Sequence, residues 1–365
     1  MLKLLQEICS IPTAPFAEQY MVRYVEAFVR RRPKLRLSRD SFGNLLIELP
    51  AKKRSPRLIF AAHIDHPGFV ARRMIDEKTV EAYFRGWVQI NYVNKTKVRF
   101  FDDGREIPGT VLEATGAEHD RLSVPDRVKI RVSERVPPGS PGMFDQGAGR
   151  TKGKLFYSRG IDDQGGVASA MAMLDVLHKK PPENPVAVLL TRAEEEGFIG
   201  AIAVVLKPKL LKKSDRIISI ECSAEQPYAQ QGHGVIIRVG DRTSIFNSSL
   251  TYFLTQQAEK LAKRDKTFRY QRALMPGGTC EATVYDVYGY VSAAVCVPLG
   301  NYHNMDKDKK KIGPEYINID DWQNMVKLFV ALAREGHTFE EGNQPLKDRV
   351  EKRFEKLKRF LSNPL

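Results

Sequence analysis

The sequence predicts an α/β fold in which helices flank a mostly parallel central sheet and a small β-barrel domain is inserted. Continuous apolar runs recur at 58–65, 185–192, 216–221 and 291–297, and such runs are typical of strands buried on both faces of a parallel sheet. Segments with helical periodicity alternate with these runs, whereas 69–156 holds short β-like pieces separated by turn residues.

The region before the insert predicts one helix and the first strands. Aromatic residues recur once per helical turn from Phe16 to Phe28, just after a proline, which predicts a helix over 15–32. Strands are expected on both sides of a turn within 35–48, and 58–65 is expected to be the first buried strand.

The insert and the region after it differ in pattern. Several short strands with frequent turns predict a small barrel over 69–156. The later helices are expected at 165–179, 198–206, 248–264 and 319–335, with a terminal amphipathic helix over 346–361. The main domain, which carries the candidate site, is therefore expected to comprise 1–68 and 157–345. The insert is 69–156, and 346–365 forms a C-terminal helix.

Charge and composition limit the classes of function. The net charge is +14, but the basic residues are dispersed and the last basic run is interleaved with acids at helical spacing, so no nucleic-acid partner is expected. No apolar stretch reaches the roughly 20 residues of a membrane helix, and the first residues do not resemble a signal peptide. We therefore expect no membrane association and a cytoplasmic location. The four cysteines lack paired spacing, so we expect them to be reduced and buried.

Metal-ligand residue types follow the apolar runs. His63 and Asp65 end the first run on the same side of a strand, where a carboxylate can fix the tautomer of a metal-binding imidazole. Asp162 and Asp163 follow a glycine and precede a helix. A core histidine and helix-capping acids are the alternatives for these two pairs.

Three further segments repeat the pattern. The acids at 194–196 follow a strand, and one of them could bind a metal while its neighbour acts as general base on a water, although an acidic helix start is the alternative. Glu221 ends the next strand, and His303 lies in a polar turn after the last one. Because the carboxyl ends of parallel strands meet at one edge of a sheet, these side chains are expected to share one metal site.

The combined motifs resemble those of the tetrahedral aminopeptidases, also called glutamyl or deblocking aminopeptidases, within the clan of co-catalytic zinc exopeptidases. The order agrees over residues 63–303. The matching motifs are HIDHPG at 63–68, GIDDQGG at 160–166, EEEGFIGA at 194–201, IE at 220–221, GGT at 277–279 and YH at 302–303. Between His63 and Asp162 lie 98 residues, and an early β-rich insert of this kind is what the family shows.

The resemblance implies a metal-dependent aminopeptidase that acts on peptide substrates through two divalent ions. The ions would be Zn²⁺, with Co²⁺ as the alternative. It implies that His63 and Glu221 hold one ion, that Glu195 and His303 hold the other, and that Asp162 bridges both. Glu194 would be the general base, and Asp65 would orient His63. The family also implies a homo-oligomer, from a dimer to a dodecamer.

Two residues depart from the family pattern. The family usually has Asp where Glu221 stands, and it commonly has Glu where His66 stands. Glu at position 221 is the usual choice in carboxypeptidase-like relatives, so a carboxypeptidase or an amide deacylase is the first alternative function. A non-catalytic basic binding protein on the same scaffold is the second.

Overall fold

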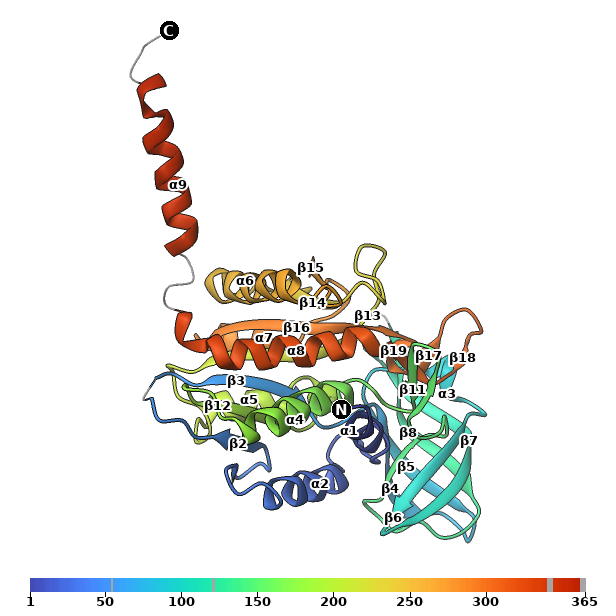
Figure 1. Cartoon of the computed structure of the whole chain (residues 1–365). Helices are drawn as coiled ribbons and strands as arrows, with labels where there is room; N and C mark the ends of the chain where they lie inside the picture. Colours follow the sequence, from blue (N-terminus) through green and yellow to red (C-terminus); the bar gives the residue numbers. More distant parts are fainter. Residues whose placement is uncertain (54, 120–121, 340–343, 362–365) are drawn as a thin grey trace.

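The computed structural model describes residues 1–53, 55–119, 122–339 and 344–361. Within these residues an eleven-stranded sheet is covered by helices on both faces, and a closed six-stranded barrel stands beside it (Figure 1). The predicted fold class is confirmed.

The centre of the sheet consists of parallel strands. β12 (Val186–Thr191), β3 (Leu58–His63), β13 (Arg216–Ala224) and β16 (Val291–Gly300) are parallel neighbours in that order, and every residue of β12 and β3 is buried. Antiparallel strands extend both sides, and β14 (Val235–Gly240) also pairs with β16 and with β15 (Tyr270–Leu274). The outer strands are β1 (Arg36–Arg39), β2 (Leu45–Leu49), β19 (Glu315–Asn318), β11 (Leu155–Ser158) and β10 (Arg150–Lys152).

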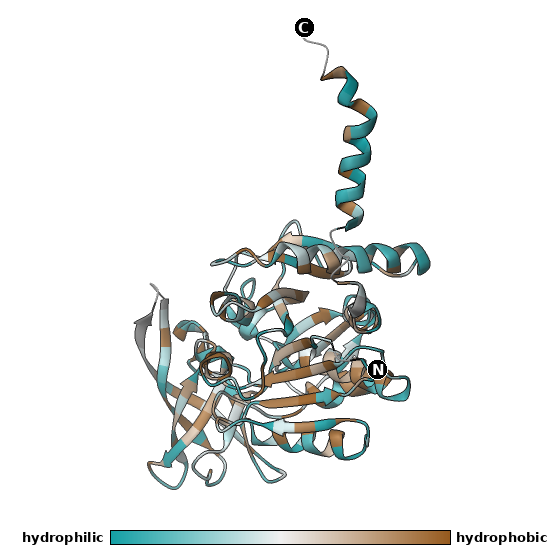
Figure 2. Cartoon of the chain, turned by 90° about the vertical axis from the view of Figure 1, so that its left-hand side faces the viewer, coloured by the Kyte–Doolittle hydropathy of each residue, from teal (hydrophilic) through white to brown (hydrophobic). Residues whose placement is uncertain are grey.

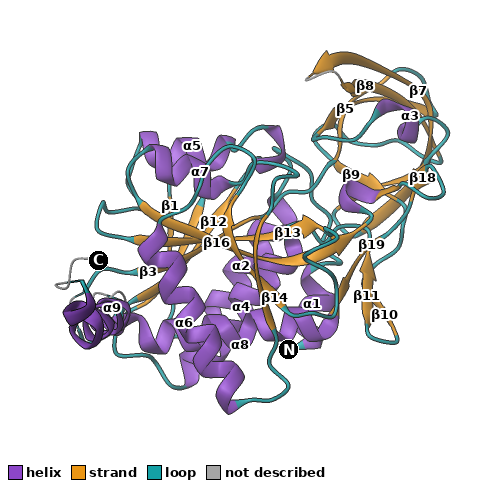
Figure 3. Cartoon of the chain, turned by 90° about the horizontal axis from the view of Figure 1, so that it is seen from above, coloured by secondary structure: helices purple, strands orange, loops and turns teal. Residues whose placement is uncertain are grey.

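Alternating side chains of the central strands build a core on each face of the sheet. Phe60 and Ala62 belong to the larger core, whereas Ile59 and Ala61 face the opposite way. The larger core is covered by α1 (Leu2–Ile8), α2 (Gln19–Arg30), α4 (Gln164–Lys179), α6 (Ser248–Arg264) and α8 (Ile319–Glu335). The smaller core is covered by α5 (Ile199–Leu206) and α7 (Glu281–Val287). Figure 3 shows α5 and α7 on one side of the sheet and α4, α6 and α8 on the other.

The barrel runs from Gly68 to Phe144 and has its own aromatic core. Phe69 packs edge-to-face on Phe84 and Phe144, with ring centroids 5.1 and 5.3 Å away. Its strands are β4 (Gly68–Met74), β5 (Thr79–Arg85), β6 (Lys97–Asp102), β7 (Arg105–His119), β8 (Leu122–Val132) and β9 (Pro141–Phe144), with the short helix α3 (Ile90–Val93) between β5 and β6. β10 and the first two residues of β11 lie within the predicted insert, and these strands pair with each other and with β19 of the central sheet. The predicted division into domains remains a prediction.

The start of the first predicted helix is wrong. α2 begins at Gln19, because Phe16 has a left-handed backbone (φ +68°) and cannot belong to a helix. The Phe16 N–H donates to the buried carboxylate of Glu18, which also pairs with Arg192 after β12 at 2.6 Å. The preceding segment forms α1, which the sequence analysis missed.

The C-terminal helix α9 (Gln344–Leu357) extends away from the main body (Figure 1), and none of its residues is buried. It is predominantly hydrophilic, with scattered apolar positions (Figure 2). In the part of the chain that the structure describes, helices with the length and apolar content needed to cross a membrane are absent. All four cysteines are free and buried, as predicted.

Candidate metal centre

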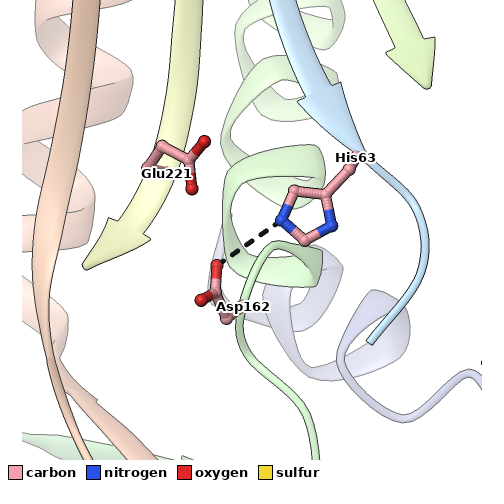
Figure 4. Close-up of side chains that lie close together, drawn as sticks. All are labelled: His63, Asp162 and Glu221. Atoms are coloured by element: carbon pink, nitrogen blue, oxygen red, sulfur yellow. Dashed lines mark ion pairs between the residues drawn. The ribbon is translucent and has the colours of Figure 1, made fainter. Parts of the chain in front are cut away.

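The register of the parallel strands brings the predicted residues to one edge of the sheet. His63 ends β3 opposite Thr191 of β12, and the turn Glu194–Glu196 follows directly. Glu221 lies near the end of β13, and His303 follows β16 in the turn Tyr302–Asn304. The loop before α4 contributes Asp162, which faces His63 and Glu221 (Figure 4).

Three overlapping groups of possible ligand atoms form at this edge. In each group the atoms lie within 4.8 Å of one another. The groups are His63 with Asp162 and Glu221, His63 with Glu194 and Glu195, and Asp162 with Glu195 and His303. All six of these predicted residues therefore converge, although they span most of the chain.

Asp162 lies between the two histidines. Its Oδ1 is 3.6 Å from His63 Nε2, and its Oδ2 is 3.9 Å from His303 Nε2. His303 Nε2 is also 3.2 Å from Glu195 Oε2, and His63 Nε2 is 3.7 Å from Glu194 Oε2. One carboxylate with an oxygen toward each histidine has the arrangement that a bridging ligand between two cations needs.

The cluster concentrates buried negative charge. Burial and the charge of Asp162 raise the pKa of Glu221 to about 8, and burial raises the pKa of Glu194 well above its usual value. Burial lowers the pKa of His303, but Glu195 and Asp162 outweigh it and raise the value to about 9. Carboxylates crowded in this way favour the binding of cations.

The buried donor atoms fit a pair of divalent ions. Within the described residues, Asp162 Oδ1, Glu195 Oε1 and Glu221 Oε1 are buried without any hydrogen-bond partner. Buried polar atoms are rarely left unpaired, and coordination to a cation would satisfy all three. Imidazole nitrogen with carboxylate oxygen is a donor set suited to Zn²⁺, and Co²⁺ accepts the same ligands.

His303 is held in one tautomer. Its Nδ1 lies 2.6 Å from the carbonyl oxygen of Trp87, to which it donates, so in the neutral ring the lone pair lies on Nε2, which faces the carboxylates. Trp87 follows the barrel strand β5, and the barrel therefore helps to orient a candidate ligand. The backbone of His303 is left-handed (φ +53°), a conformation that the surrounding contacts must maintain.

Asp65 contacts the acidic turn as well as the histidine. Its carboxylate accepts the backbone N–H groups of Glu194 and Glu195, at 3.0 and 3.1 Å. Its distance of 3.6 Å from His63 Nδ1 is longer than a hydrogen bond. The third acid of the turn, Glu196, leaves the cluster and accepts the N–H of Gly86 at 2.9 Å.

Glu315 was missed by the sequence analysis, because an acid after Gly-Pro carries no distinguishing pattern. It is fully buried, and its carboxylate accepts three backbone N–H groups. Ile161 and Asp162 donate to Oε2 at 2.6 and 3.1 Å, and His303 donates to Oε1 at 2.9 Å. One side chain thereby fixes the backbone of two candidate metal ligands.

His66 completes this network. Its Nδ1 lies 2.6 Å from the Asp162 carbonyl oxygen, and its Nε2 lies 3.0 Å from Asn304 Oδ1. The amide nitrogen of Asn304 donates to the carbonyls of Arg159 and Gly313, so its Oδ1 is an acceptor. Both ring nitrogens of His66 therefore face hydrogen-bond acceptors, and Glu315 Oε2 lies 4.0 Å from Nδ1.

A cavity of about 280 Å³ adjoins the cluster. Asp162 and Glu221 line it, together with Arg238 of β14, Thr279 and the exposed Lys307. The glycines of the GGT motif also line it, so this motif lies beside the candidate metal centre. Arg238 was missed because a single arginine in an apolar strand has no recognisable motif.

Comparisons with known proteins agree with this architecture. The model of the M42 glutamyl aminopeptidase family matches residues 43–328. No curated protein sequence matches the chain. A TET1 peptidase from Pyrococcus horikoshii is 21% identical with a TM-score of 0.74, and the match covers 92% of this chain and 99% of that one.

Two further solved structures are similar over most of their length. An aminopeptidase from the archaeon Desulfurococcus kamchatkensis is 20% identical with a TM-score of 0.74, covering 91% of this chain and 94% of that one. A TET aminopeptidase from a marine-sediment thaumarchaeote is 16% identical with a TM-score of 0.75, covering 93% and 98%. At these identities the structural matches show the shared fold.

Proposed function

Because the chain belongs to the M42 glutamyl aminopeptidase family, we propose that it is an aminopeptidase that removes N-terminal residues from peptides with two divalent metal ions. The observation that carries the two-metal part is the convergence of His63, His303 and the carboxylates around Asp162 in three overlapping groups. The unpaired buried carboxylate oxygens support it as well.

We assign the ligands according to the observed groups. His63 and Glu221 would hold one ion, Glu195 and His303 the other, and Asp162 would bridge them. When bound, such ions would polarise a scissile carbonyl and lower the pKa of an attacking water. Zn²⁺ is the expected ion, with Co²⁺ as the alternative.

Glu194 is proposed as the general base. Its carboxylate is about nine-tenths buried and lies 3.7 Å from His63, and burial raises its pKa well above the usual value, which makes it a stronger proton acceptor. It would take a proton from the attacking water and pass it to the nitrogen of the departing peptide. Asp65 supports this position through the backbone N–H groups of Glu194 and Glu195.

Self-association is also proposed. One solved structure of PhTET1, which is 23% identical, is described as a dodecamer, and the P. horikoshii TET1 peptidase as assembling into a tetrahedron or a large octahedral shell. By analogy we expect this chain to form a homo-oligomer.

The test is hydrolysis of a panel of aminoacyl p-nitroanilides by protein loaded with Zn²⁺ or Co²⁺, with and without a chelator. We expect metal-dependent release of p-nitroaniline from free aminoacyl substrates and none from the same substrates with an acetylated amine. Cleavage of N-acetylated peptides that have a free C-terminus, with release of acetate or of the C-terminal residue and without release of p-nitroaniline from the anilides, would instead support the deacylase or carboxypeptidase alternative. Hydrolysis that survives complete metal removal would contradict the metal-dependent mechanism.

A further inference from the structure

The C-terminal helix α9 has an apolar face that no other part of the described chain buries. Leu346, Val350, Phe354 and Leu357 are three or four positions apart, so they form one stripe along the helix. Val350 and Phe354 are 60% and 55% exposed, and Phe360 just beyond the helix is 62% exposed. A helix of 14 residues is marginal in water unless its amphipathic face is packed, so a surface that covers the stripe would stabilise α9.

Cations flank this stripe, and acids lie on the far side of the helix. Residues 344–361 carry seven basic and three acidic side chains, a net charge of +4. At 3.6 residues per turn, Lys347 and Arg353 lie on either side of the stripe, whereas Asp348 and Glu355 lie on the opposite face. Basic residues on both edges of an apolar stripe are typical of a helix that lies on an anionic surface.

The acids of α9 do not neutralise the cations beside the stripe. Glu355 pairs with Lys358 at 2.6 Å, and Asp348 accepts the side-chain amide of Gln344 at 2.6 Å. Among the residues that the structure describes, ion pairs from Arg349 and Arg353 to a carboxylate are absent. A partner that is anionic and also accepts apolar side chains would complement both the charge and the stripe.

A second copy of the chain is a poor match for this face. Two α9 helices packed stripe to stripe would bring Lys347 and Arg353 of each near the same cations of the other, and like charges at flanking positions are destabilising. The rest of the sequence carries a net charge of +10 (14 − 4), so other surfaces of a second copy are also positive on average. Copies can still associate through surfaces other than α9.

We propose that α9 is a peripheral anchor that lies on the surface of a bilayer containing anionic lipids. The apolar stripe enters the boundary between head groups and acyl chains, and the flanking basic side chains extend to the lipid phosphates. Because α9 extends away from the main body, it can meet a flat surface (Figure 1). The match to the family model ends at residue 328, so α9 lies outside it.

This proposal differs from the expectation of no membrane association. That expectation depended on the lack of an apolar stretch long enough to span a bilayer and of a signal peptide. A helix that lies in the plane of the membrane surface needs neither, because it buries only one face.

The test is co-sedimentation of the full-length protein with vesicles of phosphatidylcholine, alone or with about one third phosphatidylglycerol. We expect binding to the mixed vesicles to be at least about 10-fold tighter, because each Lys or Arg near an anionic surface contributes roughly a factor of 5. Binding should weaken as salt is raised from about 0.01 to 0.15 M, since the screening length falls from about 30 to 8 Å.

Phe354→Glu tests the apolar stripe, with Val287→Glu as its control. Val287 at the end of α7 is 73% exposed, so its substitution adds the same charge and removes an exposed apolar side chain away from α9. Phe354→Glu should weaken binding to the mixed vesicles by at least about 10-fold, the contribution of a buried aromatic side chain. Val287→Glu should change it by less than about 3-fold.

A matched pair of double variants tests the flanking cations. Arg349→Gln with Arg353→Gln should weaken binding by roughly 30-fold, about a factor of 5 for each charge. Lys97→Gln with Arg131→Gln removes the same charge from the exposed surface of the barrel and should have less than about 3-fold effect. In addition, the fluorescence of Phe354→Trp should shift to shorter wavelength on the mixed vesicles, because the ring leaves water.

Several outcomes overturn the proposal. These are failure of the wild-type protein to bind the mixed vesicles, equal losses in Phe354→Glu and Val287→Glu, a larger effect of the barrel double variant, or an unshifted spectrum of Phe354→Trp. Sedimentation velocity without lipid tests the other occupant: dissociation of a wild-type oligomer by Phe354→Glu would make α9 an interface between copies. Thermal unfolding verifies that the main body of each variant is folded.

Discussion

Replacing Glu315 by glutamine tests how the candidate metal ligands are held in place. The carboxylate uses Oε2 for the N–H groups of Ile161 and Asp162 and Oε1 for the N–H of His303. An amide has one acceptor oxygen, so Glu315→Gln must direct its NH₂ group at one of these donors. The substitution keeps the size of the side chain and removes its negative charge.

The expected magnitude follows from the bonds that are lost. At least one hydrogen bond to a charged acceptor disappears, and a buried N–H is left unpaired, which costs about 1.5–3 kcal/mol. If the lost bond lets the backbone of Asp162 or His303 shift, metal binding should weaken by the same free energy. That corresponds to roughly 10–100-fold in metal affinity, the range known for residues that support metal ligands. The unfolding free energy should fall by a similar amount.

The assay is competition for Zn²⁺ between the protein and a chromophoric chelator, with Asp321→Asn as the matched control. Asp321 is also a buried carboxylate that accepts two backbone N–H groups, those of Gly232 and Gly234, but it contacts none of the candidate ligands. Both variants should lose stability, and only Glu315→Gln should lose zinc affinity. Wild-type zinc affinity in Glu315→Gln, or an equal loss in Asp321→Asn, would refute the reasoning.

Three further outcomes are expected. Glu194→Gln should keep its bound zinc and lose about 10²–10⁴-fold in kcat, the usual contribution of a general base, and unchanged turnover would remove Glu194 from that role. Burial raises the pKa of Glu281 from 4.5 to about 7, so the folded metal-free protein holds this proton longer than the unfolded chain and its stability falls as pH rises from about 4.5 through 7. Glu281→Gln should reduce that decline by up to about 3 kcal/mol in denaturant unfolding at pH 5 and 8, and an identical pH dependence would contradict the assignment. Arg57→Leu should cost about 3–5 kcal/mol in the same unfolding assay, because Asp215, paired with Arg57 at 2.5 Å, would stay buried and unpaired, and a cost below about 1 kcal/mol would contradict this.

The sequence was sufficient to predict the central sheet and the place where the site forms. Apolar runs such as 58–63 and 186–191 are buried on both faces, and burial on both faces is what produces an uninterrupted apolar pattern. Parallel pairing then brings the residues after each run to the same edge. His63 and the acids after β12 could therefore be expected near one another, although their roles in binding metal remain a proposal.

The features that escaped prediction depend on contacts between distant segments. Phe16 leaves the helical pattern because Glu18 binds its N–H and Arg192 together. Glu315 and Arg238 matter through the groups that surround them, and neither has a neighbour in sequence that signals its position. The tautomer of His303 depends on a backbone carbonyl, that of Trp87, which a sequence pattern does not reveal.

The most direct test of the two-metal site is anomalous X-ray diffraction at the zinc absorption edge from crystals of the zinc-loaded protein. The account predicts two peaks on either side of the Asp162 carboxylate, one beside His63 and Glu221 and the other beside Glu195 and His303. A single peak, or peaks bound by other residues, would contradict it.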